Sequence, residues 1–568
     1  MPDIATKRTQ PHRFVADELD ATDPRAVAAI YDKLDERDIS TRAALESWIL
    51  DWEELNAVLT ECYTDAYVDM TADTTNPDYE ARFIKVVENI IPVTEQRGFI
   101  LKEKLLKSPT LDQLGPDYEV FLRNLRAEVE IFREENVPLV IEEQKLDQEF
   151  EKISGNQKAE FRGTVYTLSQ MARFLEETDR GTREEAWRAR ADVKLADADM
   201  LDTLYDRMYE LREQVAHNAG FSNYRDYQFK AMKRFDYTPE DCLTFHEAIE
   251  KHIVPVVVKD QERRRQTLGL ETLRPWDLSV DPDGHEPLRP FDTVDRLKDG
   301  CNRIIEKIDP ELGSYFRTMM DDRLLDLDNR PGKSPGGYMM SFPDRQVPFI
   351  FMNAVGTKRD VDTVLHESGH SFHYFLARHL PLNSYHHTGL EFAEVASMSM
   401  ELLSRPYLSE FYKDDELGRL KDEQIKDALR FFPFMAMIDA FQHWVYTEPE
   451  HGPEARRAKW GELEERFRPG IDWSGLEAYR DIGWQYPHVF SVPFYYVEYG
   501  IAQLAAFRVW LNSLKNEQEA VSAYKKALAL GGSRPLPELF EAAGAQFGLN
   551  DAIVSSIVEG TLEEIVSK

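Results

Sequence analysis

Cysteine is scarce in this chain of 568 residues, which contains Cys62, Cys242 and Cys301 and no Cys-x-x-Cys spacing. Three cysteines so far apart cannot build a disulfide framework or a cysteine zinc site, and they suit a reducing compartment. The sequence also lacks any uninterrupted apolar run of about 18 residues, so we expect no membrane-spanning helix. Residues 1–20 are polar, without the apolar segment of a secretory signal, and we therefore expect a cytoplasmic protein.

Positive charge is in short supply as well. The chain has 69 Lys and Arg against 103 Asp and Glu, which gives a formal net charge of −34. A surface of this sign repels phosphate backbones, so nucleic acid is excluded as an expected partner. The same charge suits cationic substrates, but it also serves solubility alone, and composition does not separate these two interpretations.

Amphipathic helical patterns fill most of the chain, and its length exceeds what one hydrophobic core usually supports. We predict a mainly α protein with two or more packed lobes, namely a helical N-terminal lobe over residues 1–220 and a second region over residues 221–568 that contains the motifs described below. One helix is expected over residues 78–108 and another over residues 117–153, where Pro138 kinks or breaks the pattern. Residues 155–168 have a more β-like pattern, and Thr238 is expected to cap a helix that runs to about residue 266.

The main strand signal lies at residues 336–342 and 347–353, with turn residues between the two runs. Pro348 inside the second run favours an edge strand, because proline cannot donate to a sheet ladder. An edge strand can bind an extended peptide by strand addition, and we expect Phe349 and Phe351 to contact such a substrate. A purely structural hairpin is the alternative interpretation.

The central motif of the sequence is His-Glu-x-x-His, formed by His366, Glu367 and His370. On a helix, a step of four residues places both imidazoles on one face, about 6 Å apart along the axis. This spacing allows two nitrogens to bind one Zn²⁺ while Glu367 lies beside the open position of the metal. Short motifs of this kind also arise by chance, so the interpretation depends on finding a third ligand.

The third ligand is expected from a later helix. A metzincin would have glycine at position 373 and histidine at position 376, where this sequence has His373 and Leu376. Glu394 is the preferred ligand because its neighbours are apolar and a buried carboxylate needs a cation; Glu391 is its competitor. Glu401 is expected either to orient a ligand imidazole or to form an ordinary salt bridge. His373 is interpreted as a supporting donor or as a structural histidine.

Glu367 is the predicted general base, which takes a proton from water and passes it to the leaving amine. A second cluster, His488 with Tyr495, Tyr496 and Tyr499, supplies donors for the oxyanion that forms at a peptide carbonyl. Tyr496 and Tyr499 share a face if the segment is helical, and we favour these two tyrosines. Tyrosines on an apolar helix are also common core residues, and that alternative remains.

These motifs together resemble the thimet-oligopeptidase/oligoendopeptidase F family of zinc peptidases, in particular its Pz-peptidase-like bacterial branch. The resemblance covers residues 234–507 and is carried by four segments in the family's order: Pro348 to Asn353, His366 to His373, Phe392 to Ser397, and His488 with Pro493 to Gln503.

The resemblance implies a helical, two-lobed molecule with a deep substrate channel and a small β-hairpin beside the zinc helix. It implies one Zn²⁺ per chain, held by His366, His370 and Glu394, with Glu367 as the base. His488 and the tyrosines would contact the oxyanion and the substrate. The interval between His488 and the tyrosines differs by about a residue from that of some members, so the donating tyrosine stays open among Tyr495, Tyr496 and Tyr499.

The sequence therefore predicts a zinc-dependent endopeptidase that cleaves short peptides. Two alternatives are a zinc metallocarboxypeptidase and a catalytically silent scaffold that binds peptides. The presence of Glu367 argues against the scaffold, because binding needs ligands but no base.

Overall fold

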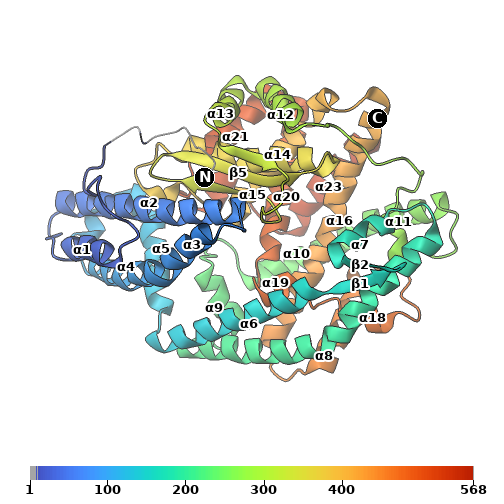
Figure 1. Cartoon of the computed structure of the whole chain (residues 1–568), viewed down its shortest axis with the longest axis horizontal. Helices are drawn as coiled ribbons and strands as arrows, with labels where there is room; N and C mark the ends of the chain where they lie inside the picture. Colours follow the sequence, from blue (N-terminus) through green and yellow to red (C-terminus); the bar gives the residue numbers. More distant parts are fainter. Residues whose placement is uncertain (1–7, 9–10, 567–568) are drawn as a thin grey trace. The chain divides into compact units, whose positions relative to one another are not determined.

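The computed structural model describes residue 8 and residues 11–566 (Figure 1). The chain forms two compact units, each assembled from three separate stretches: unit 1 is Met1–Val129, Leu288–Lys421 and Ala502–Phe547, and unit 2 is Glu130–Pro287, Asp422–Ile501 and Gly548–Lys568. The predicted division at residue 220 follows chain order, whereas these units interleave along the chain. The expectation of no secretory signal rests partly on residues 1–7 and 9–10, which lie outside the described residues.

Unit 1 contains the larger sheet and the helices around it. Its elements are α1 (Pro24–Asp35), α2 (Arg42–Ala72), α3 (Pro77–Asn89), α4 (Ile91–Leu106), α12 (Val294–Ile308), α13 (Pro310–Asp321), β3 (Leu325–Asp328), β4 (Tyr338–Phe342), β5 (Val347–Ala354), α14 (Lys358–Ala377), α15 (Leu390–Leu403), α21 (Glu517–Leu528) and α22 (Leu536–Ala542).

Unit 2 is almost entirely helical. Its elements are α6 (Val137–Asn156), β1 (Lys158–Phe161), β2 (Thr164–Thr167), α7 (Leu168–Met171), α8 (Arg180–Asn218), α9 (Tyr224–Ala231), α10 (Pro239–His252), α11 (Val254–Thr267), α17 (Pro453–Phe467), α18 (Glu477–Asp481), α19 (Pro487–Phe490) and α23 (Asp551–Val566). Three helices contribute residues to both units: α5 (Glu119–Ile131), α16 (Asp414–Thr447) and α20 (Tyr496–Lys515). The mainly α prediction is confirmed.

Local sequence signals explain where several helices begin and end. Thr238 caps α10 in a reciprocal capping box with Asp241, as its position before a proline predicts. The helix expected over residues 78–108 is divided at Ile90, which ends α3 and precedes α4, with a proline in the first turn of α4. The helix expected over residues 117–153 is likewise divided, and Pro138 lies in the first turn of α6, where a proline is tolerated.

The strands that the structure describes form two small sheets, β1-β2 and β3-β5-β4. The β1-β2 hairpin confirms the β-like pattern at residues 155–168. In the larger sheet β5 is the central strand, so the edge position predicted from Pro348 is wrong for the strand as a whole. The reason is local: β3 pairs with β5 only from Ile350 onward, and Pro348 precedes that pairing and has β4 alone beside it.

Phe349 and Phe351 are completely buried in this sheet. The ring of Phe351 stacks on Tyr338 with centroids 4.7 Å apart, and Phe349 meets Phe342 edge to face. Both side chains therefore contribute to the core of unit 1, and their complete burial does not fit the expected contact with a substrate. The outer strand of the hairpin is β4, so its backbone is the part of the hairpin that can offer free hydrogen-bonding groups.

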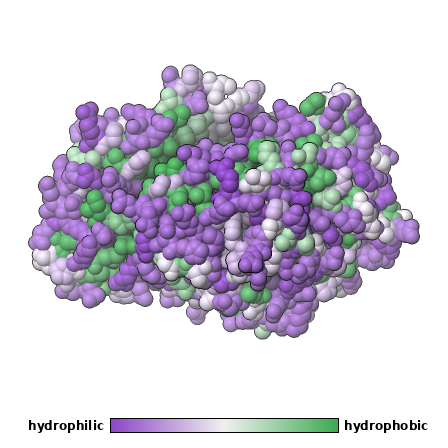
Figure 2. All heavy atoms as spheres, turned by 90° about the horizontal axis from the view of Figure 1, so that it is seen from below, coloured by the Kyte–Doolittle hydropathy of each residue, from purple (hydrophilic) through white to green (hydrophobic). Residues whose placement is uncertain are grey.

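Within the described part of the chain, no helix combines the length and the hydropathy needed to cross a lipid bilayer. Figure 2 shows hydrophilic residues over most of the face that it draws, with hydrophobic residues in small patches between them. This surface agrees with a chain in which 30% of the residues are charged. The three cysteines are buried and form no disulfide.

Candidate metal centre

Helices α14 and α15 of unit 1 pack closely against each other, and α14 also lies beside β5 (Figure 1). Gly369, in the middle of α14, permits this close approach. A Cβ atom at this position would lie 2.4 Å from the carbonyl oxygen of Ala396 and 2.6 Å from the Cα atom of Ser397. Thr357 caps the start of α14 in a capping box with Asp360, which sets the position of the helix after β5.

The close packing brings the three predicted ligands together. The Nε2 atom of His366 lies 3.3 Å from Oε2 of Glu394, and the Nε2 atom of His370 lies 3.7 Å from Oε1 of the same carboxylate. The two imidazole rings have centroids 5.0 Å apart and are nearly perpendicular. One donor atom from each residue lies within 4.8 Å of the other two. Glu394, rather than Glu391, is therefore the carboxylate that faces both histidines.

Glu401, two turns along α15 from Glu394, holds the other nitrogen of His366. Its Oε1 atom lies 2.6 Å from Nδ1 of His366, which leaves Nε2 directed toward Glu394. Burial of the imidazole opposes protonation, but the carboxylates of Glu394 and Glu401 raise the pKa of His366 well above its usual value. The prediction that Glu401 orients a ligand imidazole is consistent with this contact.

The carboxylate of Glu394 is buried yet ionised. Its burial favours the neutral form, but the hydrogen bond with His366 and the electrostatic interaction with His370 lower the pKa of Glu394 to about 2. The hydroxyl of Ser397 donates a hydrogen bond of 2.7 Å to Oε2 of Glu394. Desolvation lowers the pKa of His370 to about 4, so this imidazole is neutral and has a free lone pair at neutral pH.

Glu367 has a different environment from that of Glu394. Burial raises the pKa of Glu367 to about 7, a rise that the positive charge of His366 opposes. The backbone N–H of Met339 in β4 donates a hydrogen bond to this carboxylate. A carboxyl group with a pKa near neutrality can both accept and return a proton, which is the property that a general base of this kind needs.

The donor set fits a zinc ion. Two imidazole nitrogens and one carboxylate oxygen are the ligands of many catalytic zinc sites, which keep a fourth position open. Among the described residues, two further groups bring three ligand-type atoms together: Cys242, Asp439 and His443, which are fully buried in unit 2, and Asp281, Asp283 and His285, in a largely exposed loop. The group on α14 and α15 has the carboxylate of Glu367 next to His366 in the same helix, α14.

His373 does not bond to the predicted ligands. Its ring is buried, its Nε2 atom has no hydrogen-bond partner among the described residues, and the ring packs edge-on against Phe392. Desolvation lowers the pKa of His373 to about 3, so it is neutral. These contacts favour the structural interpretation of His373.

The second predicted cluster lies in unit 2. The ring of His488, in α19, lies 4.3 Å from that of Tyr496 and stacks on Tyr486 at 5.3 Å. Tyr496 begins α20 and packs against Tyr499 one turn later, with ring centroids 5.9 Å apart. The Tyr499 hydroxyl donates to the hydroxyl of Tyr495 at 3.5 Å. The predicted pairing of Tyr496 and Tyr499 on one helix is confirmed, with Tyr495 just before the helix.

Two polar residues that sequence reasoning missed hold the backbone before these tyrosines. Phe494 has a positive φ of 67°, a conformation that costs energy for a residue with a side chain. Its backbone N–H donates to Oε1 of Gln442 at 2.5 Å, and its carbonyl oxygen accepts from Arg234, which also pairs with Glu498 at 2.7 Å. No short sequence motif predicts these contacts, because they join residues far apart in the sequence.

Comparisons with known proteins point to one peptidase family. The family model "Peptidase family M3" matches residues 173–559. The chain is 25% identical over 418 residues to an oligoendopeptidase F homologue of Borreliella burgdorferi and 22% identical over 404 residues to oligopeptidase PepF of Bacillus subtilis. These matches cover 69% and 66% of this chain but only 65% and 56% of the two relatives.

A solved structure of PZ peptidase A with an inhibitor is similar over 99% of each chain, with a TM-score of 0.86 and 29% identity. The family resemblance predicted from the four sequence segments is confirmed.

Proposed function

Because the chain belongs to peptidase family M3, which implies a metal cofactor, we propose that it is a cytoplasmic, zinc-dependent endopeptidase acting on short peptides. The observation that carries this proposal is the group of donor atoms from His366, His370 and Glu394, which lie within 4.8 Å of one another. Glu367 lies on α14, the helix that carries the two histidines. A metal site of structural type needs no base, whereas hydrolysis does.

In this proposal His366, His370 and Glu394 hold one zinc ion. Bound there, zinc supplies a positive charge that lowers the pKa of an adjacent water and polarises a carbonyl group. Glu401 keeps the proton of His366 on Nδ1 and so leaves Nε2 free as a ligand. Glu367 accepts the proton of the attacking water and delivers it to the amine nitrogen that leaves the cleaved peptide bond.

We assign stabilisation of the developing oxyanion to His488, Tyr496 and Tyr499. Their hydroxyl and imidazole groups are donors of the kind that such a step uses. Desolvation lowers the pKa of His488 and raises the pKa of Tyr496, so the imidazole is neutral and the phenol keeps its proton. Tyr495 is assigned to substrate contact. Phe349 and Phe351 have no contact with the substrate in this proposal; their buried rings hold β5 in place beside β4.

The experiment that tests the function is the hydrolysis of a length series of internally quenched peptides, with the cleaved bond mapped by mass spectrometry. We expect cleavage at internal bonds, loss of activity with a chelator, and recovery with zinc. A peptide with an amidated C-terminus is still cleaved by an endopeptidase, whereas a metallocarboxypeptidase rejects it. Peptide binding without any turnover of the zinc-loaded protein would identify a silent scaffold instead.

A further inference from the structure

Unit 2 contains a pocket of about 350 Å³, between α6, α8 and the segment around α18 and α19. Five residues of α8 line it at helical spacing, which shows that one face of the helix forms a wall: Trp187, Arg190, Ala191, Lys194 and Leu201. Its volume lies at the lower end of the range for small-molecule sites. None of the described residues that line the pocket is Asp or Glu, although acids outnumber basic residues in the chain as a whole.

Arg190 and Lys194 are the two cations of this pocket, and neither forms an ion pair with a described residue. The Nε atom of Arg190 is buried and has no hydrogen-bond partner. Lys194 has an exposed side chain, yet desolvation and then the charge of Arg190 lower its pKa. Lys194 therefore lies in a solvent-accessible pocket, where the surrounding protein partly desolvates its ammonium group.

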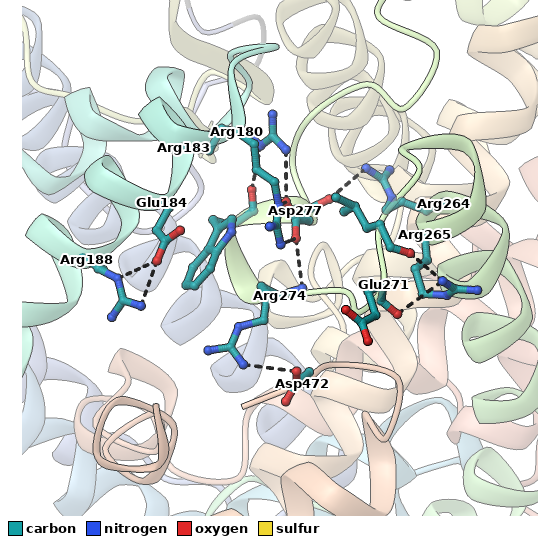
Figure 3. Close-up of polar contacts among 12 residues, drawn as sticks. Arg180, Arg183, Glu184, Arg188, Arg264, Arg265, Glu271, Arg274, Asp277 and Asp472 are labelled. Atoms are coloured by element: carbon teal, nitrogen blue, oxygen red, sulfur yellow. Dashed lines mark hydrogen bonds and ion pairs between the residues drawn. The ribbon is translucent and has the colours of Figure 1, made fainter. Parts of the chain in front are cut away.

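The neighbouring arginines of α8 differ from Arg190 in having partners (Figure 3). Arg180 donates two hydrogen bonds, of 2.9 and 2.8 Å, to the carboxylate of Asp277, and Arg183 donates one of 3.0 Å to the same group. Arg188 pairs with Glu184 at 2.8 Å. These contacts fix the first turns of α8, and hence the direction of the face that carries the unpaired cations.

Aromatic rings shape the remainder of the pocket. Trp187 packs edge-on against Tyr479, with centroids 5.6 Å apart, and against Trp276 at the same distance. The two glutamine side chains of the lining are already engaged: Gln485 donates to Ala198 O at 2.8 Å, and Gln157 donates to Asp197 at 2.9 Å. The charged donors on the α8 wall, those of Arg190 and Lys194, form no ion pair with a described residue.

From this geometry we infer that the pocket binds the C-terminal carboxylate of a peptide, with an apolar or aromatic terminal side chain against Trp187 and Tyr479. A carboxylate would form charge-assisted hydrogen bonds with Arg190 and Lys194 and reduce the repulsion between them. The aromatic wall offers contact area to an apolar side chain next to that charge. This inference rests on the proposed function, because it takes the anion to be the end of a peptide.

The test measures binding by calorimetry, which does not depend on peptide cleavage. The ligands are N-acetyl-phenylalanine, its amide, and the α-amide of N-acetyl-glutamic acid, whose carboxylate is on the side chain. We expect the free acid to bind the zinc-loaded protein about tenfold more tightly than the amide. If the glutamate derivative binds more tightly than N-acetyl-phenylalanine, the pocket recognises acidic side chains, and the assignment to a peptide C-terminus is overturned.

The variant Arg190→Gln/Lys194→Met removes both charges at similar side-chain size and should abolish the preference for the free acid. The charge-conserving variant Arg190→Lys/Lys194→Arg should restore most of it. Lys152→Met and Arg263→Gln remove exposed cations of unit 2 outside the pocket, and neither should change the preference.

Two results would overturn the inference: equal binding of the acid and the amide by the unaltered protein, or an unchanged preference in the Arg190→Gln/Lys194→Met variant. Failure of the proposed function has a different signature, namely no hydrolysis of any peptide by the zinc-loaded protein. The binding preference is measured independently of that outcome, so the two failures are distinguishable.

Discussion

The Nδ1 atom of His366 lies 2.6 Å from Oε1 of Glu401, while Nε2 of the same ring faces Glu394 at 3.3 Å. In the proposed site, Glu401 would hold the proton on Nδ1 of His366 and leave Nε2 to the metal. The two carboxylates belong to the same helix, α15, so a single element sets both the ligand and its orientation.

Glu401→Gln should weaken zinc binding about 10- to 100-fold, because the amide is a weaker partner for the imidazole than the carboxylate is. The measurement is zinc affinity by competition with a chromophoric chelator. Glu210→Gln, which removes an exposed carboxylate of α8, is the matched control and should leave the affinity unchanged. Equal affinities of the Glu401→Gln variant and the unaltered protein would show that this contact has no orienting role.

Gly369→Ala should destabilise unit 1 by about 1–3 kcal/mol, because the new methyl group would overlap backbone atoms of α15. It should also weaken zinc binding, since the ligands lie on the two helices that must separate. Urea denaturation and chelator competition measure the two effects. Gly98→Ala is the matched control: Gly98 lies within α4 with no atom within 4 Å of an added Cβ, so this change should stabilise by about 0.5–1 kcal/mol. Similar free energies of unfolding for both variants would contradict the packing argument.

The pH dependence of kcat/KM should show an acid limb set by Glu367. The base must be ionised, so kcat/KM falls as the pH drops through the pKa of Glu367, which burial raises to about 7. A bound cation favours the carboxylate and moves this limb to a lower pH than 7. The profile is measured with metal content determined at each pH, which separates protonation of the base from loss of zinc. A flat profile down to about pH 5 with zinc retained would remove Glu367 from this role.

Tyr496→Phe and Tyr499→Phe test the oxyanion donors. Loss of the donating hydroxyl should reduce kcat about 10²- to 10³-fold, with little change in zinc content. Tyr227→Phe, elsewhere in unit 2, is the control and should retain full kcat. Comparison with Tyr495→Phe then identifies which tyrosine donates. If all three phenylalanine variants keep their kcat, the cluster is part of the core and His488 is the remaining candidate donor.

Much of the site was predictable because its signals are local. His366 and His370 lie one turn apart, and Glu394 is an acid among apolar residues on the next long helix, α15. Helix periodicity also places Glu401 two turns from Glu394 on the same face, but its contact with His366 was one of two sequence interpretations and depends on the packing of α15 against α14. Helical periodicity therefore reaches the three candidate ligands, and the packing of α15 against α14 decides for Glu394 over Glu391.

Other features depend on contacts that no local pattern encodes. The central position of β5 follows from its pairing with β3. This strand has only four residues, and the sequence pattern did not predict it. The positive φ of Phe494 depends on Gln442 and Arg234, both distant in sequence. Arg190 belongs to a charged helix on which most arginines are paired, so its lack of a partner becomes visible only in the folded unit 2.

The most direct test of the central claim is the activity and metal content of Glu367→Gln. The amide keeps the size of the side chain but cannot accept a proton from water, so the rate of peptide cleavage should fall by about 10²- to 10⁴-fold. Zinc content should stay at one ion per chain, because the proposed ligands His366, His370 and Glu394 are intact. Full peptidase activity of this variant with zinc bound would contradict the account.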